Sequence, residues 1–396
     1  MNQEQAIIAQ TEAVSARNYK PLPVVLHRGE GVWVWDVEGR RYLDCLSAYS
    51  SLNQGHRHPK IIQALYEQAE RLTLTSRAFH NDRMGGFLEL LCKTVGMEMA
   101  LPMNTGAEAV ETAVKAARKW GYTKKGVAPG KAEIIVCNQN FHGRTTTAVA
   151  MSSESGSREH FAPFTPGFVH VPFGDAAAME AAITENTVAV LFEPIQGEAG
   201  IVIPPEGYLT AARRICTDNN VLFILDEIQT GFARTGHLLC HQHEPEAKPD
   251  MLILGKALGG GVYPVSAIAT SREIMSVFQP GDHGSTFAGN PLASAVGAAA
   301  ISVVLDEDLA ERSRELGTRL MAGLRGIGSP IVTEIRGRGL FVGIEIDRPA
   351  RPFCEALMQR GVLCKETHEH VIRLAPPLVI EAAEIDWLVE QFAAVL

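Results

Sequence analysis

The stretch VLFILDEIQ at residues 221–229 indicates the architecture, because five apolar residues in a row are followed at once by two acids. A strand with one face in water alternates apolar and polar residues, so an unbroken apolar run indicates a strand covered on both faces. Similar runs occur at residues 134–137, 188–192 and 251–254. Between them lie helical patterns such as residues 108–120, where apolar residues recur every three or four positions. The sequence therefore predicts an α/β fold with a mostly parallel central sheet flanked by helices.

Each predicted strand is followed by polar or ionisable residues. These segments are NQNFHGR (138–144), EPIQGE (193–198), DEIQ (226–229) and GK (255–256). Because ligands bind at the carboxyl ends of strands in open α/β sheets, we expect the segments to form one site. Lys256, partly desolvated, is a candidate Schiff-base nucleophile, and Asp226 a candidate partner for a pyridine nitrogen. That pair fits pyridoxal phosphate, and it fits a plain lysine–aspartate ion pair equally well.

A phosphate site is predicted where residues 104–107 open the helix at 108–120. Backbone N–H groups and the Thr105 hydroxyl at the positive end of the helix would hold an anion, although Thr105 also fits as a simple N-cap. Other signatures fail: residues 126–131 are one residue short of a P-loop, and residues 337–343 are one too long for a dinucleotide fingerprint. No metal site is predicted, since the histidine pairs are interpreted as surface or turn residues. These pairs are His56/His58, His241/His243 and His368/His370.

The composition is that of a globular protein with two or three lobes, with 46% hydrophobic and 20% charged residues among 396. We predict an N-terminal segment (1–45) that contributes to a small domain, a large cofactor-binding domain (46–290) and a C-terminal small α+β domain (291–396). The net charge of −9 argues against nucleic acid or an anionic membrane as a partner. Residues 283–305 lack charge but are predicted as a buried helix rather than a membrane span. Seven scattered cysteines and a start without signal or transit features predict a cytoplasmic protein.

Six long motifs resemble those of the class III (fold type I) pyridoxal phosphate-dependent aminotransferases. They are NTGAEA (104–109), FHGR (141–144), EPIQGE (193–198), DEIQTG (226–231), GKALGGG (255–261) and HGSTF (283–287). The resemblance spans residues 18–377. It implies that Lys256 binds pyridoxal 5'-phosphate as a Schiff base and then transfers protons as acid and base. It also implies that Asp226 pairs with the pyridine nitrogen.

The resemblance implies the remaining cofactor contacts as well. Phe141 stacks on the ring, Gln229 lies beside the ring hydroxyl, and Gly106 and Ala107 donate N–H groups to the phosphate. Thr105 and His142 complete the predicted cofactor-binding set. Ser285 and Thr286 are expected to reach the phosphate of a neighbouring subunit. The family therefore implies a homodimer with shared active sites.

Substrate choice rests on fewer residues. Arg144 matches the arginine for the distal carboxylate of 2-oxoglutarate or the α-carboxylate of ornithine, and Arg373 matches the one for the α-carboxylate of glutamate. Tyr19 and Tyr49 match two tyrosines typical of ornithine-type members, with Tyr19 facing the α-amino group. The implied reaction transfers the δ-amino group of ornithine to 2-oxoglutarate. Acetylornithine and 4-aminobutyrate aminotransferases are the alternatives, and they generally carry an aliphatic residue in place of Tyr49.

Two further residues bear on this interpretation. Glu198 is expected to pair with Arg373 while ornithine reacts and to move away for 2-oxoglutarate. His142 stands where eukaryotic ornithine enzymes have Trp, and FHGR is shared with acetylornithine enzymes. A non-catalytic amino-acid-binding protein on the same fold would not need Lys256, Asp226 and Gln229 together.

Overall fold

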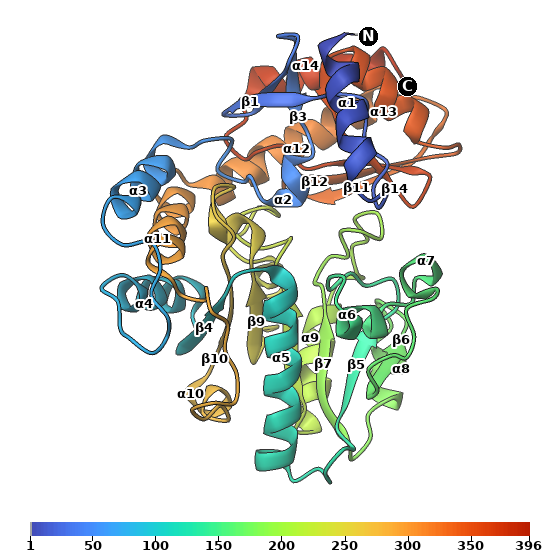
Figure 1. The fold of residues 1–396 in the computed structure, drawn as a ribbon. Helices are drawn as coiled ribbons and strands as arrows, with labels where there is room; N and C mark the ends of the chain where they lie inside the picture. Colours follow the sequence, from blue (N-terminus) through green and yellow to red (C-terminus); the bar gives the residue numbers. More distant parts are fainter. Residues whose placement is uncertain (1) are drawn as a thin grey trace.

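A seven-stranded sheet forms the centre of the molecule in a computed structural model that describes residues 2–396 (Figure 1). Its order is β4-β10-β9-β8-β7-β5-β6. The strands are β4 (Met99–Met103), β5 (Glu133–Cys137), β6 (Phe168–Val171), β7 (Thr187–Phe192), β8 (Leu222–Asp226), β9 (Met251–Leu254) and β10 (Ser266–Thr270). Neighbours are parallel except at β10, which is antiparallel to β4 and β9. The predicted mostly parallel sheet is confirmed.

Both faces of this sheet are covered, which explains the unbroken apolar runs. In β8, Phe223 and Leu225 belong to one buried cluster, and Leu222 and Ile224 to another. Successive side chains of a strand point to opposite faces, so a strand between two layers needs apolar residues throughout. The surrounding helices are α5 (Gly106–Trp120), its π-helical extension η1 (Gly121–Lys125), α6 (Thr146–Met151), α7 (Ser155–Arg158), α8 (Ala176–Ala181), α9 (Tyr208–Asp218) and α10 (Arg272–Met275).

Two four-stranded sheets lie beyond this layer, in the order β1-β2-β3-β13 and β11-β12-β15-β14. Their strands are β1 (Leu26–Glu30), β2 (Trp33–Asp36), β3 (Arg41–Asp44), β11 (Val332–Arg338), β12 (Phe341–Ile346), β13 (Val362–Leu363), β14 (Lys365–Thr367) and β15 (Val371–Leu374). β13 pairs in parallel with β3, so the two ends of the chain share a sheet. Blue and red segments accordingly meet at the top of Figure 1. The helices of this region are α1 (Gln3–Val14), α12 (Leu309–Gly326), α13 (Arg351–Gln359) and α14 (Ala382–Ala393).

A third set of elements lies beside the large sheet and near its junction with the small region (Figure 1). It comprises the short turn α2 (Ser47–Ser50), α3 (Pro59–Ala69), α4 (Met84–Val95), η2 (Cys240–His243), η3 (Lys256–Gly259) and α11 (Pro291–Asp306). A Cβ added at Gly297 of α11 would lie 2.7 Å from the Phe87 ring of α4, so α11 packs closely against the large region. The domain limits at 45 and 290 stay a prediction.

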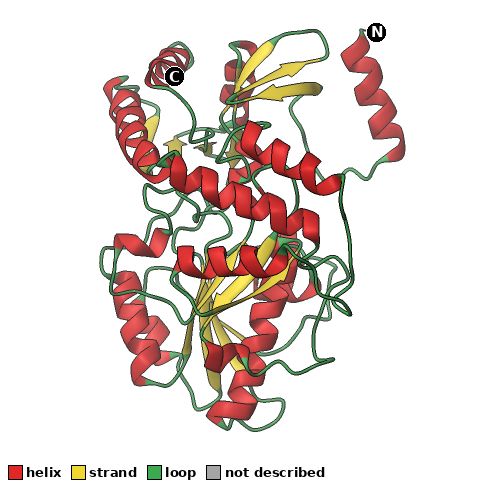
Figure 2. Cartoon of the chain, turned by 90° about the vertical axis from the view of Figure 1, so that its left-hand side faces the viewer, coloured by secondary structure: helices red, strands yellow, loops and turns green. Residues whose placement is uncertain are grey.

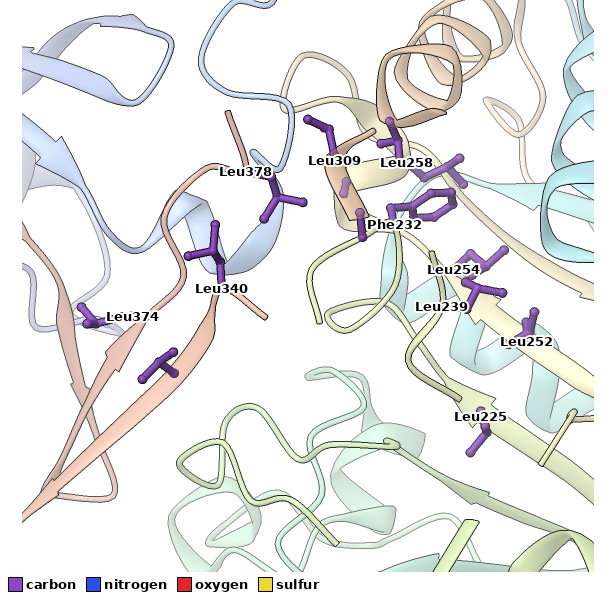
Figure 3. Packing of buried hydrophobic residues seen from close by; sticks show 14 of the residues in the cluster. Leu225, Phe232, Leu239, Leu252, Leu254, Leu258, Leu309, Leu340, Leu374 and Leu378 are labelled. Carbon is purple, nitrogen blue, oxygen red and sulfur yellow. The ribbon is translucent and has the colours of Figure 1, made fainter. Parts of the chain in front are cut away.

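One apolar cluster joins the large and small regions. Figure 3 shows its side chains running from Leu374 in the small sheet and Leu340 in the turn before β12, past Leu309 and Phe232, to Leu252 of the large sheet. Figure 2 shows the large sheet in the lower half with helices around it and both termini at the top. Because this shared core is close-packed, the residues at the boundary between the regions hold fixed positions.

The histidine interpretation is wrong for His241. Its side chain is buried, and its Nδ1 lies 2.9 Å from Oε1 of Glu227. Glu227 is buried completely and also accepts from the Cys240 and His241 N–H groups at 2.6 and 2.9 Å. The acid next to Asp226 thus fixes the loop that follows β8. Residues 2–396 hold no group of three or more His, Cys, Asp or Glu side chains arranged for a metal ion.

The uncharged stretch at 283–305 becomes a loop followed by α11, whose buried side chains include Val296 and Ile301. Within the described part of the chain, the helices are too short or too polar to cross a bilayer.

Candidate active site

The segments that follow β5, β7, β8 and β9 meet around one cavity, as predicted. The cavity has an empty volume of about 550 Å³. Its lining residues are Gly106, Ala107, Phe141, His142, Gly143, Glu193, Asp226, Ile228, Gln229, Thr230 and Lys256. The carboxyl ends of the parallel strands therefore gather acid, base and backbone groups at one edge of the sheet.

Asp226 is held from two sides. Its Oδ2 lies 2.7 Å from Nδ1 of His142, and its Oδ1 accepts from the Ile228 N–H at 3.1 Å. The His142 side chain is completely buried, and although burial opposes it, Asp226 raises the pKa of His142. Asp226 is therefore paired with histidine rather than joined to lysine in a simple ion pair.

Lys256 opens η3 directly after β9, with a left-handed φ of 45°. Burial lowers the pKa of its amine, an effect opposed mainly by the negative charge of Glu198. A lowered pKa increases the share of neutral amine, which is the nucleophilic and basic form. Lys256 is thus suited to covalent chemistry and to proton transfer in this cavity.

Glu193 has a role that sequence reasoning missed. Its carboxylate accepts from the Phe141 N–H at 2.9 Å and from the Gly197 N–H at 3.4 Å, so it fixes the segment that carries Phe141. Burial raises the pKa of Glu193 to about 7, an effect opposed by His142. The only sequence signal for Glu193 is its position directly after a buried strand. An acid at such a position is usually just a solvated strand end.

We expect Glu193→Gln to change how stability depends on pH. Between pH 4.5 and 7 the unfolded carboxyl is ionised while the folded one keeps its proton, so rising pH destabilises the wild-type fold. The penalty is complete above pH 7 and amounts to about 3 kcal/mol. Glutamine does not titrate, so its melting temperature relative to wild type should rise from pH 5 to pH 8. Parallel melting curves across this range would contradict the assignment.

The start of α5 forms the opposite wall of the cavity. Thr105 is its N-cap, because its Oγ1 accepts from the Glu108 N–H at 3.2 Å while Glu108 accepts from the Thr105 N–H at 2.9 Å. The Thr105 side chain therefore makes the capping box, and the next N–H groups, of Gly106 and Ala107, have no acceptor within the helix. The predicted anion site rests on these two donors and on the helix dipole.

Ser285 lies against this helix within its own chain. Its Oγ accepts from Asn104 Nδ2 at 2.8 Å and donates to Glu108 Oε1 at 3.0 Å. Thr286 beside it is exposed. Their contact with the phosphate of a neighbouring subunit stays a prediction.

These residues fit pyridoxal phosphate. A Cβ on Gly106 would approach Ile228 to 3.0 Å, so glycine keeps the wall at the first turn of α5 open. The cavity offers an anion-binding helix start at one end, the Asp226 carboxylate for a pyridine nitrogen, and an amine in Lys256. This donor set matches a phosphate, a basic ring nitrogen and an aldehyde in one molecule.

An ion pair between a buried arginine and a partly buried glutamate lies next to this cavity. Arg373, on β15 and 2% exposed, donates from Nη1 to Glu198 Oε1 at 2.6 Å. The Tyr49 ring lies 4.9 Å from the guanidinium carbon of Arg373. Gln229 donates from Nε2 to Glu198 at 3.4 Å and to the Tyr49 carbonyl at 3.3 Å. The structure thus brings together four of the residues predicted for substrate and cofactor.

Arg144 lies at a more open place. It is exposed, donates to Ser157 Oγ at 2.9 Å, and has its guanidinium carbon 5.4 Å from the Phe141 ring. One hollow is lined by both Arg144 and Glu198, and another by Arg144 and Tyr19. Tyr19 itself is 73% exposed. The predicted substrate residues therefore lie around a path that leads outward from the cavity.

Comparison with known proteins agrees with this site. The family described as "Aminotransferase class-III" matches residues 14–396. The ornithine aminotransferase of Geobacillus sp. (strain WCH70) is 60% identical over 391 residues, which is 99% of this chain and 98% of the relative.

Two solved structures share the fold over almost the whole chain. The Toxoplasma gondii ornithine aminotransferase, solved with partial occupancy of PLP at its active site, is 44% identical with a TM-score of 0.98, covering 99% of this chain and 94% of that one. An acetylornithine aminotransferase from Elizabethkingia anophelis is 47% identical with a TM-score of 0.91, covering 100% and 99%. The predicted resemblance is confirmed, and the chain belongs to the class III aminotransferase family.

Proposed function

We propose that this chain transfers the δ-amino group of L-ornithine to 2-oxoglutarate, giving glutamate-5-semialdehyde and glutamate in a ping-pong cycle. The observation that carries the proposal is the Glu198–Arg373 pair beneath Tyr49, directly beside the cavity of Lys256. A site that accepts a diamine and then a dicarboxylate in turn needs an arginine whose charge can be masked. The full-length relative of 60% identity points to the same substrate.

Pyridoxal phosphate supplies the electron sink that stabilises negative charge on the carbon next to the reacting nitrogen. We assign its phosphate to the Gly106 and Ala107 N–H groups, its ring nitrogen to Asp226, and its ring face to Phe141. Gln229 is assigned to the ring hydroxyl. His142 keeps Asp226 in place through its 2.7 Å contact, and Glu193 does the same for the Phe141 backbone.

Lys256 moves the proton at the reacting carbon. Burial lowers the pKa of its amine, which favours the neutral form that can take this proton and return it two atoms away, on the other side of the reacting nitrogen. The closed apolar surroundings of η3, where Ala257 and Leu258 are buried, keep bulk water from the amine. The residue thus acts first as the anchor of the cofactor and then as acid and base.

Arg144 and Tyr19 recognise the far end of ornithine. When the δ-amine reaches Lys256, the α-carboxylate and α-amine lie several bonds outward, where the two side chains line one hollow. A guanidinium binds a carboxylate with two parallel hydrogen bonds, which fixes orientation as well as charge. For 2-oxoglutarate, Arg144 takes the distal carboxylate and Arg373 the α-carboxylate.

Acetylornithine aminotransferase is the second candidate. The shared FHGR segment and the solved relative of 47% identity favour it. A half-reaction screen decides between them: enzyme loaded with cofactor is mixed with ornithine, acetylornithine, lysine or 4-aminobutyrate, and loss of the cofactor's visible absorbance is followed. Ornithine should react fastest by kcat/KM. A faster reaction with acetylornithine would refute the proposal and identify the enzyme as an acetylornithine aminotransferase.

We expect Tyr49→Ile to weaken ornithine selectivity. The phenol is assigned a polar contact near the α-substituents of ornithine, and losing a hydrogen bond to a charged group costs about 1.5–3 kcal/mol. The ornithine-to-4-aminobutyrate ratio of kcat/KM should therefore fall by about ten- to a hundredfold. Val14→Ile, at an exposed position at the end of α1 and away from the cavity, serves as control. If Tyr49→Ile leaves the ornithine-to-4-aminobutyrate ratio unchanged, Tyr49 contributes only packing.

A homodimer is part of the proposal. Several large apolar side chains are exposed on the single chain, among them Tyr66, Leu72, Phe79 and Phe287, at 63, 44, 73 and 49%. Phe287 follows directly on Ser285 and Thr286, so a second copy covering it would bring subunits together at the phosphate end of the site. Sedimentation should give twice the mass of one chain.

The cytoplasm is the proposed compartment, supported by seven free cysteines, six of them buried.

A further inference from the structure

Residues 47–50 form one turn of left-handed helix without a glycine. Their φ angles are 49°, 45°, 60° and 69° for Ser47, Ala48, Tyr49 and Ser50, and ψ is 49° at Ala48 and 46° at Tyr49. In this conformation Cβ crowds the following carbonyl oxygen, so L-residues other than glycine adopt it singly and rarely in succession. Nothing in the segment SAYS relieves that strain.

The surrounding structure holds this turn at both ends. Before it, Asp44 Oδ1 accepts from the Leu46 and Ser47 N–H groups at 3.0 and 2.8 Å, and Asp44 Oδ2 lies 2.8 Å from Nε2 of His56. Within it, the Ser51 N–H donates to the Ser47 carbonyl at 2.8 Å.

After the turn, two buried amides tie the chain to the large region. Asn53 Nδ2 donates to the Phe232 carbonyl at 2.8 Å, and Gln54 Nε2 donates to the Ala257 carbonyl, next to Lys256, at 2.9 Å. A strained backbone conformation persists only where surrounding contacts such as these hold it in place. Such conformations are found most often at functional sites.

The turn presents Tyr49 to the substrate arginine. The Tyr49 carbonyl accepts from Gln229, and the Tyr49 ring lies 4.9 Å from the guanidinium carbon of Arg373. In a right-handed or extended backbone the Cα–Cβ bond of Tyr49 would point elsewhere, and the ring would leave Arg373. The stacked ring also attracts the guanidinium through its π-face, which helps to fix Arg373 in its pair with Glu198.

We propose that the left-handed turn at 47–50 sets the donor preference of the enzyme by holding Tyr49 against Arg373. The inference rests on the proposed function. It holds that the backbone conformation of the turn acts on the substrate through the Tyr49 side chain. Ala48 is a positioning residue in this scheme: it is exposed, and its contribution is its φ angle rather than a contact of its own.

Donor preference should then follow the ease with which residue 48 adopts a positive φ. Ala48→Val places a β-branched residue where it is strongly disfavoured, and the exposed position has room for its methyl groups. The ornithine-to-4-aminobutyrate ratio of kcat/KM should fall about tenfold. Ala48→Gly and Ala48→Asn tolerate positive φ, so they should keep the ratio within about twofold and the melting temperature at or above that of wild type.

Two controls separate this effect from general loss of stability. Asn220→Val places the same β-branched residue at another positive φ, 51°, in an exposed turn between α9 and β8, and should lower the melting temperature without changing the ratio. Because asparagine favours positive φ more than alanine does, this control should lose at least as much stability as Ala48→Val. In a Tyr49→Ile background, Ala48→Val should change the ratio by less than about twofold, because the two changes act through one side chain.

The outcomes are distinguishable. The proposal is overturned if Ala48→Val leaves the ratio unchanged, or if it lowers the ratio equally with and without Tyr49. A wild-type enzyme that prefers another donor to ornithine would instead refute the proposed function. The residue-48 variants and their controls would then be tested by the kcat/KM ratio for that donor.

Discussion

Lys256→Ala should lose transamination by at least about 10⁴-fold while keeping its fold. The cavity has one amine at the end of β9, and burial lowers the pKa of that amine, as both covalent attachment and proton transfer require. Alanine removes the anchor and the acid–base group together. The side chain it removes is partly desolvated and lies in a polar cavity, so little apolar packing is lost. Steady-state turnover of ornithine with 2-oxoglutarate and the melting temperature would be measured side by side.

Lys125→Ala is the matched control. Burial lowers the pKa of this lysine too, and its amine donates to the Thr187 carbonyl at 2.6 Å, far along the sheet from the cavity. It should keep turnover near wild type. Turnover within about tenfold of wild type in Lys256→Ala would refute the role of this lysine, whereas a lost fold would show as a lowered melting temperature.

Sequence reasoning found the strands that carry an unbroken run of large apolar residues and missed β4 and β10, which do not. The runs at 134–137, 188–192 and 251–254 fall within β5, β7 and β9, because full burial leaves an unbroken apolar signal. β4 (MALPM) contains a proline and lies at the edge of the sheet, where proline is tolerated. β10 (SAIAT) has a single large apolar residue, Ile268, among small and polar ones, so its sequence resembles a loop. Tertiary pairing, not local pattern, makes both of them strands.

The same distinction applies to the site. The residues after each strand could be predicted to meet, since topology alone brings strand ends together. The contact of His142 with Asp226 and the backbone role of Glu193 could not, because both depend on side chains meeting across strands. The left-handed turn carries no glycine or asparagine, so nothing in its own sequence predicts it. Thr105 was ambiguous between anion contact and N-cap, and its Oγ1 makes the cap.

Glu198→Ala should turn the donor preference from ornithine toward glutamate. With ornithine reacting at its δ-amine, no substrate carboxylate lies near Arg373, and this arginine is 2% exposed. A buried charge without a partner is costly, and Glu198 at 2.6 Å supplies the partner. Although burial opposes it, Arg373 lowers the pKa of Glu198, so the carboxylate is in its charged form. Alanine leaves Arg373 free for the α-carboxylate of glutamate and penalises ornithine.

The expected shift is about 1.5–3 kcal/mol in relative transition-state binding, or about ten- to a hundred-and-fiftyfold in the glutamate-to-ornithine ratio of kcat/KM. Single-turnover loss of cofactor absorbance with each donor would measure it. Glu366→Ala is the control, because Glu366 lies on the adjacent strand β14 and pairs with Arg351 at 3.3 Å rather than with Arg373. If the ratio stays constant in Glu198→Ala, or moves toward ornithine, the carboxylate only satisfies a buried arginine, and the two substrates must be distinguished farther out, at Arg144 and Tyr19.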